Sequence, residues 1–219
     1  MVKTPSSQST RPAPRLYLVT PPVDDADALA GLLRTAIEAA DVAAVLLHLK
    51  PAAERELIDR TKTLAAIVQP TGAALVLAGH AEIVARAGAD GAHLTGIAAF
   101  TDAVETLKPE RIAGCGGLTT RHDAMTAGER GADYVMFGEP KPDGYRPPLE
   151  ATLDRVEWWS ALFEIPCVAY AGEPGEITSL VAAGADFIAV GGSLWDDPRG
   201  VAAALGDIVR QFAVPEPAA

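Results

Sequence analysis

The sequence predicts one α/β domain folded as a TIM (β/α)8 barrel, and three observations lead to this fold class. A Gly-Ala-Asp turn followed by an apolar run recurs at 85–94, 128–137 and 181–190. Its glycines, Gly88, Gly131 and Gly184, are 43 and 53 residues apart, close to twice the length of one strand–helix unit. Short apolar runs alternate with helical stretches, which indicates a parallel sheet with helices outside it. About 200 residues lie between the two polar termini, enough for eight such units.

Each element is predicted by its own local pattern. The expected strands are the apolar runs at 16–20, 42–49, 73–77, 91–94, 111–115, 133–137, 166–170 and 187–190. A helical stretch follows each run. The first helix, 26–40, is expected to begin after Asp24 or Asp25 as N-cap, and the last to begin at Asp197-Pro198. Each recurring segment predicts a helix that ends on glycine, an Asp turn and then a buried strand.

An open doubly wound sheet is the alternative fold for the same alternation. Such a sheet usually has a glycine-rich turn directly after its first strand. Here that turn reads Thr20-Pro21-Pro22, so the closed barrel is preferred. We expect the barrel to span 15–213, with disordered tails at 1–14 and 214–219, because both tails lack apolar periodicity.

Charge and composition exclude several classes of protein. The formal net charge is −11, so the surface as a whole does not attract a nucleic-acid backbone, and no nucleic-acid partner is expected. No apolar run has the length of a membrane span or the character of a signal peptide, so we expect a cytoplasmic protein without a membrane partner. Cys115 and Cys167 have neither metal-site spacing nor the pattern of a disulfide framework. A homodimer is the expected assembly. Of Trp158 and Trp159, one is expected in the core and the other can be a dimer contact.

In such a barrel the reactive groups lie at the carboxyl ends of the strands. His48 and Lys50 follow the second strand in the parity of Leu46, so all three are expected to face inward. His80 and His93 end the next two strands. Three converging imidazoles can bind a transition metal, or one can act as a general base near neutral pH. The preferred interpretation is that they are hydrogen-bonded pocket residues that never meet, so no metal site is predicted.

Glycines after the last two expected strands form the sharpest binding signal. Gly172 follows the seventh strand, and Gly191, Gly192 and Ser193 follow the eighth. Without a Cβ the backbone can approach an anion closely, and amides at a helix start point at it. TIM barrels frequently hold a phosphate at these two loops. We expect a phosphate site there, with Lys50 able to neutralise a second phosphate; the alternative is that the glycines only turn a tight corner.

Other polar side chains at the strand ends complete the candidate site. Glu139 and Glu173 lie on the loops after the sixth and seventh strands, where either can accept a proton, contact an amine or simply be solvated. Lys50, His48, His80, His93 and Glu139 are therefore the candidate catalytic residues. Tyr17, Thr119 and Lys141 are the candidate substrate-binding residues.

These strand ends resemble those of the thiamine phosphate synthase family, which includes the thiazole tautomerases. The resemblance runs from 16 to about 212 and depends on LYLVT at 16–20, AGADGAHL at 87–94, GADYVMFGEPKPD at 131–143, PCVAYAG at 166–172 and AGADFIAVGGSLWDDP at 183–198. It implies a transferase of thiamine biosynthesis that joins a hydroxymethylpyrimidine diphosphate to a thiazole phosphate. It also implies that Mg²⁺ assists departure of the diphosphate, whose stabilisation is the main catalytic demand.

The chain departs from the family pattern at most positions that the resemblance makes catalytic. The family's Gln-x-Arg-x-Lys strand end reads Leu-x-His-x-Lys at 46–50, so only Lys50 is retained. Its Asn-Asp-Arg turn reads Ala-Gly-His at 78–80, and the region of its second Asp reads Thr-Gly-Ile-Ala at 95–98, so the usual carboxylate ligands of Mg²⁺ are absent. Its Ser-x-His-Thr segment keeps only Thr119.

Losing one transition-state-stabilising donor costs roughly a hundred- to a thousandfold in rate. We therefore predict a thiamine phosphate synthase-like protein that binds a phosphorylated thiazole or pyrimidine, with synthase activity weak or absent. One alternative is a divergent enzyme that acts on another phosphorylated heterocycle by His or Glu acid–base chemistry. The other is a non-catalytic binder or regulator of thiamine phosphates.

Overall fold

The sheet closes into a barrel with its strands in chain order, and every neighbouring pair is parallel. The computed structural model describes residues 12–141 and 143–212. Its strands are β1 (Arg15–Val19), β2 (Val42–Leu47), β3 (Ala74–Ala78), β4 (Gly91–Thr95), β5 (Ile112–Gly116), β6 (Tyr134–Phe137), β7 (Cys167–Ala171) and β8 (Phe187–Val190). The predicted TIM barrel is confirmed. Residues 1–11 and 214–219 of the two expected tails lie outside the described residues, as does 213, the last residue of the expected barrel.

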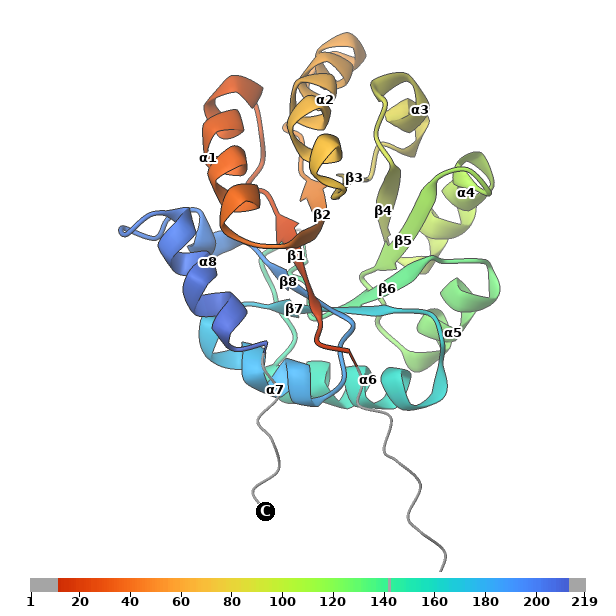
Figure 1. Ribbon diagram of the computed structural model, residues 1–219. Coiled ribbons are helices and arrows are strands. Elements are labelled where there is room, and N and C mark those ends of the chain that lie inside the picture. Colours follow the sequence, from red (N-terminus) through yellow and green to blue (C-terminus); the bar gives the residue numbers. More distant parts are fainter. Residues whose placement is uncertain (1–11, 142, 213–219) are drawn as a thin grey trace, which may run out of the picture.

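Helices surround the barrel on its outside (Figure 1). In the described part of the chain they are α1 (Ala26–Ala39), α2 (Glu54–Val68), α3 (Val84–Ala87), α4 (Ile97–Leu107), α5 (Arg121–Glu129), α6 (Leu149–Leu162), α7 (Ile177–Ala182) and α8 (Val201–Arg210). Short 3-10 turns add η1 (Gln69–Thr71), η2 (Ala81–Ile83), η3 (Pro174–Glu176) and η4 (Gly192–Leu194). None of the described helices is both long and apolar enough to cross a membrane.

Side-chain alternation along the strands builds two layers of core. Leu16 and Leu18 of β1 belong to the large core between the strands and the helices. Tyr17 and Val19 belong to a smaller core inside the barrel, together with Leu46 of β2. Successive strand residues point to opposite faces, so one strand supplies both layers. The inner layer also places Tyr17 below the barrel mouth.

The recurring Gly-Ala-Asp segment ties neighbouring strands together. Gly88, Gly131 and Gly184 have the positive φ expected where a helix ends on glycine. The Asp of each segment then accepts a hydrogen bond from the amide near the start of the preceding strand. These bonds are Leu75 N to Asp90 Oδ2 at 2.7 Å, Ala113 N to Asp133 Oδ2 at 2.7 Å and Cys167 N to Asp186 Oδ2 at 2.8 Å. Each tie joins two adjacent strands, β3 to β4, β5 to β6 and β7 to β8.

Two helix starts differ from the prediction or refine it. The last helix, α8, begins at Val201 after Gly200, not at Asp197-Pro198. The Asp197 carboxylate accepts hydrogen bonds from the amide and guanidinium of Arg199, so Asp197 stabilises a turn before the helix instead. At the first helix, Asp25 is the N-cap and accepts the amides of two residues in the first turn.

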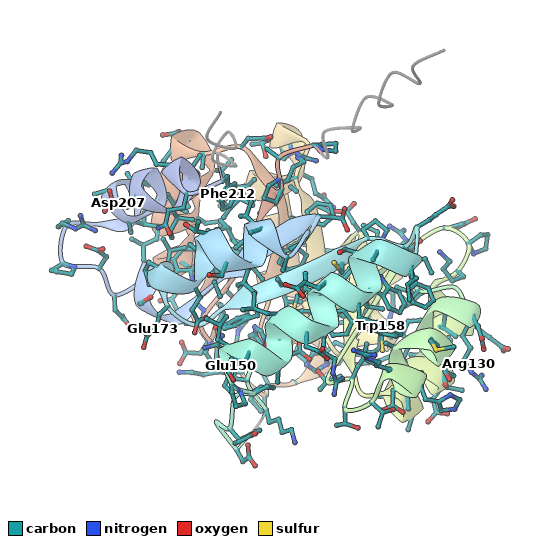
Figure 2. The ribbon with its side chains drawn as sticks, turned by 90° about the horizontal axis from the view of Figure 1, so that it is seen from below. Arg130, Glu150, Trp158, Glu173, Asp207 and Phe212 are labelled. Atoms are coloured by element: carbon teal, nitrogen blue, oxygen red, sulfur yellow. The ribbon has the colours of Figure 1, made fainter. Side chains whose placement is uncertain are left out.

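Of the two adjacent tryptophans on α6, Trp159 is the core residue. It is fully buried, its Nε1 donates to Ile165 O at 2.7 Å, and its ring stacks on Phe163. Trp158 is half-buried on the side of α6 that faces α5 (Figure 2), where the Arg121 guanidinium lies 4.9 Å from its ring centroid. Arg121 therefore covers part of the surface that was a candidate dimer contact.

Candidate functional site

The inner face of β5 carries no side chain at Gly114 and Gly116. A Cβ on Gly114 would lie 2.1 Å from Cζ of Tyr134, and a Cβ on Gly116 would lie 2.3 Å from Oε1 of Glu139. Tyr134 comes from β6 and Glu139 from the loop that follows β6. These two side chains therefore fill the space that β5 leaves open at the barrel mouth.

Four side chains form one continuous hydrogen-bonded chain through this space. Tyr17 Oη lies 2.7 Å from Tyr134 Oη, which lies 3.0 Å from His93 Nδ1. His93 Nε2 lies 2.9 Å from Glu139 Oε2. The two tyrosines and His93 are buried, and the His93 ring stacks on that of Tyr134. The sequence-predicted residues Tyr17, His93 and Glu139 are thus brought together from three different parts of the chain.

Burial keeps the two tyrosine hydroxyls protonated. It raises the pKa of Tyr17 and Tyr134 well above the ordinary value of 10.0, and the Glu139 carboxylate adds to both shifts. A protonated hydroxyl can donate one hydrogen bond and accept others. The Tyr134 hydroxyl can therefore donate a hydrogen bond to His93 Nδ1 while it accepts one from Tyr17.

His48 lies close enough to this chain to interact with it electrostatically. Burial lowers the pKa of His48 below 6.5, and repulsion from His93 lowers it further, whereas the Glu139 carboxylate opposes the shift. The amide of His48 donates to Thr20 Oγ1 at 3.1 Å. In the described part of the chain, two buried side-chain polar atoms have no hydrogen-bond partner, His48 Nδ1 and Glu139 Oε1. Both unpartnered atoms belong to residues at the barrel mouth.

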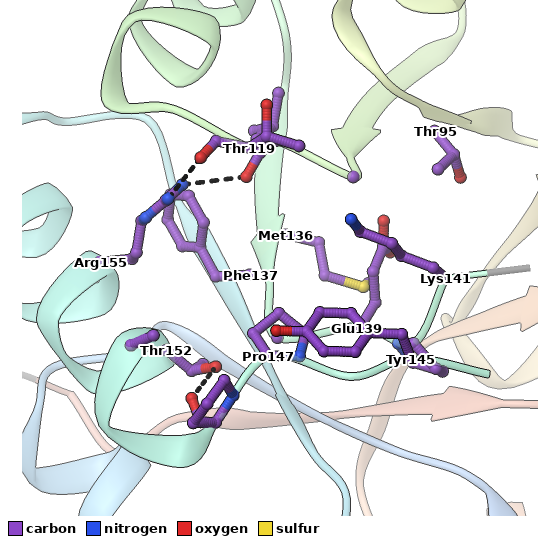
Figure 3. Close-up of a pocket in the computed structure, with 16 residues that line it drawn as sticks. Thr95, Thr119, Met136, Phe137, Glu139, Lys141, Tyr145, Pro147, Thr152 and Arg155 are labelled. Carbon is purple, nitrogen blue, oxygen red and sulfur yellow. Dashed lines mark hydrogen bonds between the residues drawn. The ribbon is translucent and has the colours of Figure 1, made fainter. Parts of the chain in front are cut away.

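A cavity of about 260 Å³ opens beside Glu139, at the carboxyl ends of β4, β5 and β6. Its walls include Met136, Phe137, Tyr145, Pro147 and Pro148, and its polar groups come from Thr95, Thr119, Glu139, Lys141 and Arg155. Figure 3 shows Thr119 and Arg155 on one side and Glu139, Lys141 and Tyr145 on the other. The cavity is therefore an apolar slot with one carboxylate and two cationic side chains on its rim.

The two cations of this cavity are engaged with their own neighbours. Arg155 donates to Leu118 O at 2.9 Å and to Thr119 O at 2.5 Å, which fixes the loop after β5. Lys141 Nζ lies 5.2 Å from the ring centroid of Tyr145. Lys141 is exposed, so it is the cation that a ligand in the cavity can reach.

The glycine corners after β7 (Gly172) and after β8 (Gly191 and Gly192) lie side by side, as the sequence predicts. The amide of Gly172, however, already donates a hydrogen bond within the protein. Ala171 of β7 pairs with Val190 of β8, so Gly172 and Gly191 follow paired residues. Gly172 N donates to Glu176 Oε2 at 2.8 Å. The amides of Gly192 and Ser193, in contrast, have no hydrogen-bond acceptor among residues 12–141 and 143–212. Within the expected phosphate site, the corner after β8 is therefore the part whose backbone N–H groups have no acceptor in the described part of the chain.

Arg146 fixes the corner after β7. Its guanidinium donates to both carboxylate oxygens of Glu176, at 2.8 and 2.5 Å, and to Gly138 O at 3.2 Å. A Cβ on Gly172 would lie 2.1 Å from Arg146 Nη1, so a side chain there would displace the guanidinium. Burial alone would raise the pKa of Glu176, but the hydrogen bonds from Arg146 and the Gly172 amide outweigh it and hold that pKa below 4.5.

Lys50 and His80 lie outside the hydrogen-bonded chain and outside the cavity. Lys50 Nζ lies 2.6 Å from Asp24 Oδ2, and the lysine side chain is half exposed. His80 Nδ1 lies 3.2 Å from Glu82 Oε1. The structure therefore brings together His48, His93 and Glu139 but not the other two candidate catalytic residues.

The residues present do not fit the Mg²⁺ site that the resemblance implies. β3 ends at Ala78 and is followed by Gly79, and β4 ends at Thr95 and is followed by Gly96, so neither strand end supplies a carboxylate. Glu82, the next carboxylate after β3, is exposed and paired with His80. No three of the described His, Cys, Asp and Glu residues gather in a way that could hold a metal ion.

Sequence reasoning missed Tyr134, Arg146 and Glu176. Tyr134 lies inside an expected strand and was not recognised as an inward-facing polar residue. The alternation of Gly114 and Gly116 was the available signal, because a strand without inner side chains leaves room for a neighbour's large ones. Arg146 and Glu176 are separated by 30 residues on two loops, and nothing in their local sequence indicates that they pair.

The family model and the curated relatives agree on one family. The family model described as "Thiamine monophosphate synthase" matches residues 16–194. The thiamine-phosphate synthase of Rhodospirillum centenum is 40% identical over 199 residues, covering 90% of this chain and 96% of that protein. The thiamine-phosphate synthase of Hyphomonas neptunium is 37% identical over 209 residues, covering 89% and 92%. Among solved structures, thiamine phosphate pyrophosphorylase from Pyrococcus furiosus superposes with a TM-score of 0.71 at 24% identity, covering 90% of this chain and 95% of that one.

Proposed function

The chain belongs to the thiamine monophosphate synthase family, a family of thiamine biosynthesis, and from this premise we propose that it binds a phosphorylated thiazole or pyrimidine at the barrel mouth. We further propose that it joins the two substrates slowly or not at all. One observation supports the second statement: the ends of β3 and β4, where the family pattern has its Mg²⁺ ligands, carry no carboxylate.

The binding part of the proposal is supported by donors that face no protein acceptor. The amides of Gly192 and Ser193 stand at the start of η4, next to the corner of Gly172. Backbone amides in such a turn favour an anion, and TIM barrels often use this position for phosphate. Lys141 supplies an exposed positive charge at the cavity beside Glu139. A ligand with a phosphate at the corner and a ring in the cavity meets both sets of groups.

The low synthase rate follows from the chemistry of the leaving group. Departure of a diphosphate requires stabilisation of several negative charges, which a divalent cation and its carboxylate ligands ordinarily supply. Here Lys50, which the resemblance places near the diphosphate, is paired with Asp24. Each missing stabilising group costs roughly a hundred- to a thousandfold, so the combined loss leaves little turnover.

Acid–base chemistry on a phosphorylated heterocycle is a second candidate function, and one observation favours it. Glu139 lines the cavity, and its Oε2 lies 2.9 Å from Nε2 of the buried His93, within hydrogen-bonding distance. A paired imidazole and carboxylate can pass a proton to or from a bound ring. This function predicts a bell-shaped pH–rate profile, whereas a non-catalytic binder shows ligand stabilisation without turnover.

Two measurements test the proposal. The protein is incubated with hydroxymethylpyrimidine diphosphate, thiazole phosphate and Mg²⁺, and turnover of at least about 1 s⁻¹, ordinary for an enzyme, contradicts the loss of synthase activity. Thermal shifts are then compared for thiamine phosphate, thiazole phosphate, the pyrimidine diphosphate and inorganic phosphate, with and without Mg²⁺. A ligand at a hundred times its Kd stabilises the fold by about 2.7 kcal/mol.

A matched pair of lysine variants locates the binding. Lys141→Ala removes the exposed cation of the cavity and should reduce the thermal shift given by the phosphorylated ligands. Lys62→Ala removes an exposed lysine from α2, outside the cavity, and should leave that shift unchanged. Equal shifts in both variants and the wild type contradict a ligand at this cavity.

A further inference from the structure

We propose that Arg146 and the amide of Gly172 form an anion site that the chain's own Glu176 carboxylate occupies. A phosphate group binds there by displacing Glu176, so this carboxylate lowers the affinity of the corner after β7 for a phosphomonoester. The inference rests on the proposed function, since it concerns how phosphate gains access to that same corner. It makes Glu176 a built-in competitor of the ligand and Arg146 the cation that receives the phosphate.

The contacts of the Glu176 carboxylate are those of a bound anion. Arg146 Nη1 donates to Oε1 at 2.8 Å, and Nη2 donates to Oε2 at 2.5 Å. The amide of Gly172 donates to Oε2 at 2.8 Å. A guanidinium fork and a backbone N–H suit two oxygens of a phosphate as well as the two oxygens of a carboxylate. The donor set is therefore not specific for a glutamate side chain.

These donors keep their positions through contacts that do not involve Glu176. Arg146 Nε donates to Gly138 O at 3.2 Å, and its Nη2 lies 3.5 Å from Tyr170 O. The two carbonyls belong to the residue after β6 and to β7, so the backbone of the barrel supports the guanidinium from two strands. Gly172 leaves room for it, because a Cβ there would lie 2.1 Å from Nη1. Arg146 can therefore stay in place when the carboxylate leaves.

The Glu176 carboxylate is ionised at neutral pH and is not sealed from solvent. Burial opposes its ionisation, but the hydrogen bonds from Arg146 and Gly172 outweigh burial and hold the pKa of Glu176 below 4.5. The side chain of Glu176 is 15% exposed, and that of Arg146 is 22% exposed. A fully buried ion pair would lose several kcal/mol when one partner departs, whereas here water or a small anion can reach the edge of the pair. Exchange of one anion for another is therefore feasible.

The occupied donors lie beside the free half of the phosphate corner. Gly172 and Gly191 follow paired residues of β7 and β8, and neighbouring strands lie about 4.8 Å apart. The amides of Gly192 and Ser193 have no acceptor in the described part of the chain. A phosphate that spans both corners needs the donors that Glu176 holds. A phosphate on the β8 corner alone is repelled by the negative charge of Glu176.

A purely structural tie between two loops is the other explanation for this ion pair, and it predicts the opposite sign. If Arg146 and Glu176 only fasten the loop after β6 to the corner after β7, then removing Glu176 loosens the corner and weakens phosphate binding. If Glu176 competes with the ligand, its removal strengthens phosphate binding, and the gain depends on Arg146. The direction of the change in affinity therefore separates the two explanations.

Isothermal titration calorimetry with inorganic phosphate at neutral pH measures that direction. Glu176→Ala empties the site and should tighten binding at least about tenfold, the effect of one good hydrogen bond to a charged group. Glu176→Gln keeps the side-chain length without the charge and should tighten binding by less. The double variant Arg146→Ala with Glu176→Ala should lose the gain. Glu157→Gln makes an equal change of charge at an exposed position on α6 and should match the wild type.

Several outcomes overturn the inference. They are unchanged or weaker phosphate binding in both Glu176 variants, a gain that survives in the double variant, and an equal gain in Glu157→Gln. Carbon-13 NMR of the wild type gives a readout that does not depend on the folding of a variant. Saturating phosphate should shift the side-chain carboxyl resonance of Glu176 as the carboxylate leaves Arg146, and a resonance that stays fixed overturns the inference as well.

The proposed function is scored separately, by binding of thiazole phosphate and thiamine phosphate to the wild type. Binding of these ligands without a gain for phosphate in the Glu176 variants defeats this inference alone. A gain for inorganic phosphate in Glu176→Ala, with no binding of the phosphorylated ligands by the wild type, defeats the proposed function alone.

Discussion

The carboxyl group of Glu139 stands where Gly116 would carry a side chain, since a Cβ on Gly116 would lie 2.3 Å from Glu139 Oε1. A residue of β5 and a residue of the loop after β6 therefore constrain each other. The candidate catalytic carboxylate can take its position only because the neighbouring strand has glycine there. This coupling makes Gly116 the most direct way to perturb the site without touching any polar group.

Gly116→Ala should displace the Glu139 carboxylate and destabilise the fold. The new methyl group overpacks a filled space, which costs about 1–3 kcal/mol of unfolding free energy. Denaturant unfolding measures the loss. Gly31→Ala is the control, because its Cβ would meet nothing within 4 Å on α1. That change should add about 0.5–1 kcal/mol; equal stability of the two variants would argue against a filled space.

Asp186→Ala should weaken the tie between β7 and β8. The variant leaves the Cys167 amide without its side-chain acceptor, and hydrogen bonds to charged groups contribute about 1.5–3 kcal/mol. Asp186→Asn keeps an acceptor oxygen and should lose less. Asp154→Ala breaks an exposed ion pair with Arg121 and should cost about 1 kcal/mol at most. Urea unfolding curves compare the three, and a similar loss in all of them would contradict a specific tie.

The ion pair of Glu176 with Arg146 should make stability depend on pH in acid. The pKa of Glu176 lies below 4.5 in the folded protein, so its ionised form is favoured by folding. The resulting stabilisation is present above pH 4.5 and is lost as the pH falls through the folded-state pKa. Unfolding of the wild type and of Glu176→Gln should therefore differ most near neutral pH and converge in acid. A difference that stays constant down to pH 3 would contradict this linkage, and Glu157→Gln provides the baseline.

His48 should titrate below its ordinary value of 6.5, because burial and then repulsion from His93 disfavour its charged form. The proton resonances of its ring, followed by NMR against pH, give the midpoint directly. In His93→Gln the repulsion is removed while the burial remains, so the midpoint should rise. A midpoint at or above 6.5 in the wild type would contradict the buried environment of this imidazole.

The arrangement of strands and helices was predictable because it depends on local patterns. Gly88, Gly131 and Gly184 each end a helix, and the apolar run after each one has the length of a buried strand. Parity along β1 likewise places Tyr17 inward and Leu16 and Leu18 outward. The closed barrel follows from the number of such units. None of these features requires knowledge of distant contacts.

The candidate site was predictable only in part, because its geometry depends on pairs far apart in the chain. His48, His93 and Glu139 were identified from their place at strand ends. Lys50 was expected inward by parity, but β2 ends at Leu47, so the alternation no longer applies and the side chain pairs with Asp24. The contact of Arg146 with Glu176 joins two loops.

Each of the three Asp hydrogen bonds joins two neighbouring strands at the rim opposite the mouth. They group β3 with β4, β5 with β6 and β7 with β8, and we call each pair a sector. The fourth sector, β1 with β2, has an ion pair of Arg15 with Asp41 in the corresponding place. A chain break between two sectors leaves the three Asp hydrogen bonds and the Arg15–Asp41 ion pair intact. A break between the two strands of one sector separates the residues that its contact joins. A circularly permuted protein should therefore tolerate new termini best at the sector boundaries.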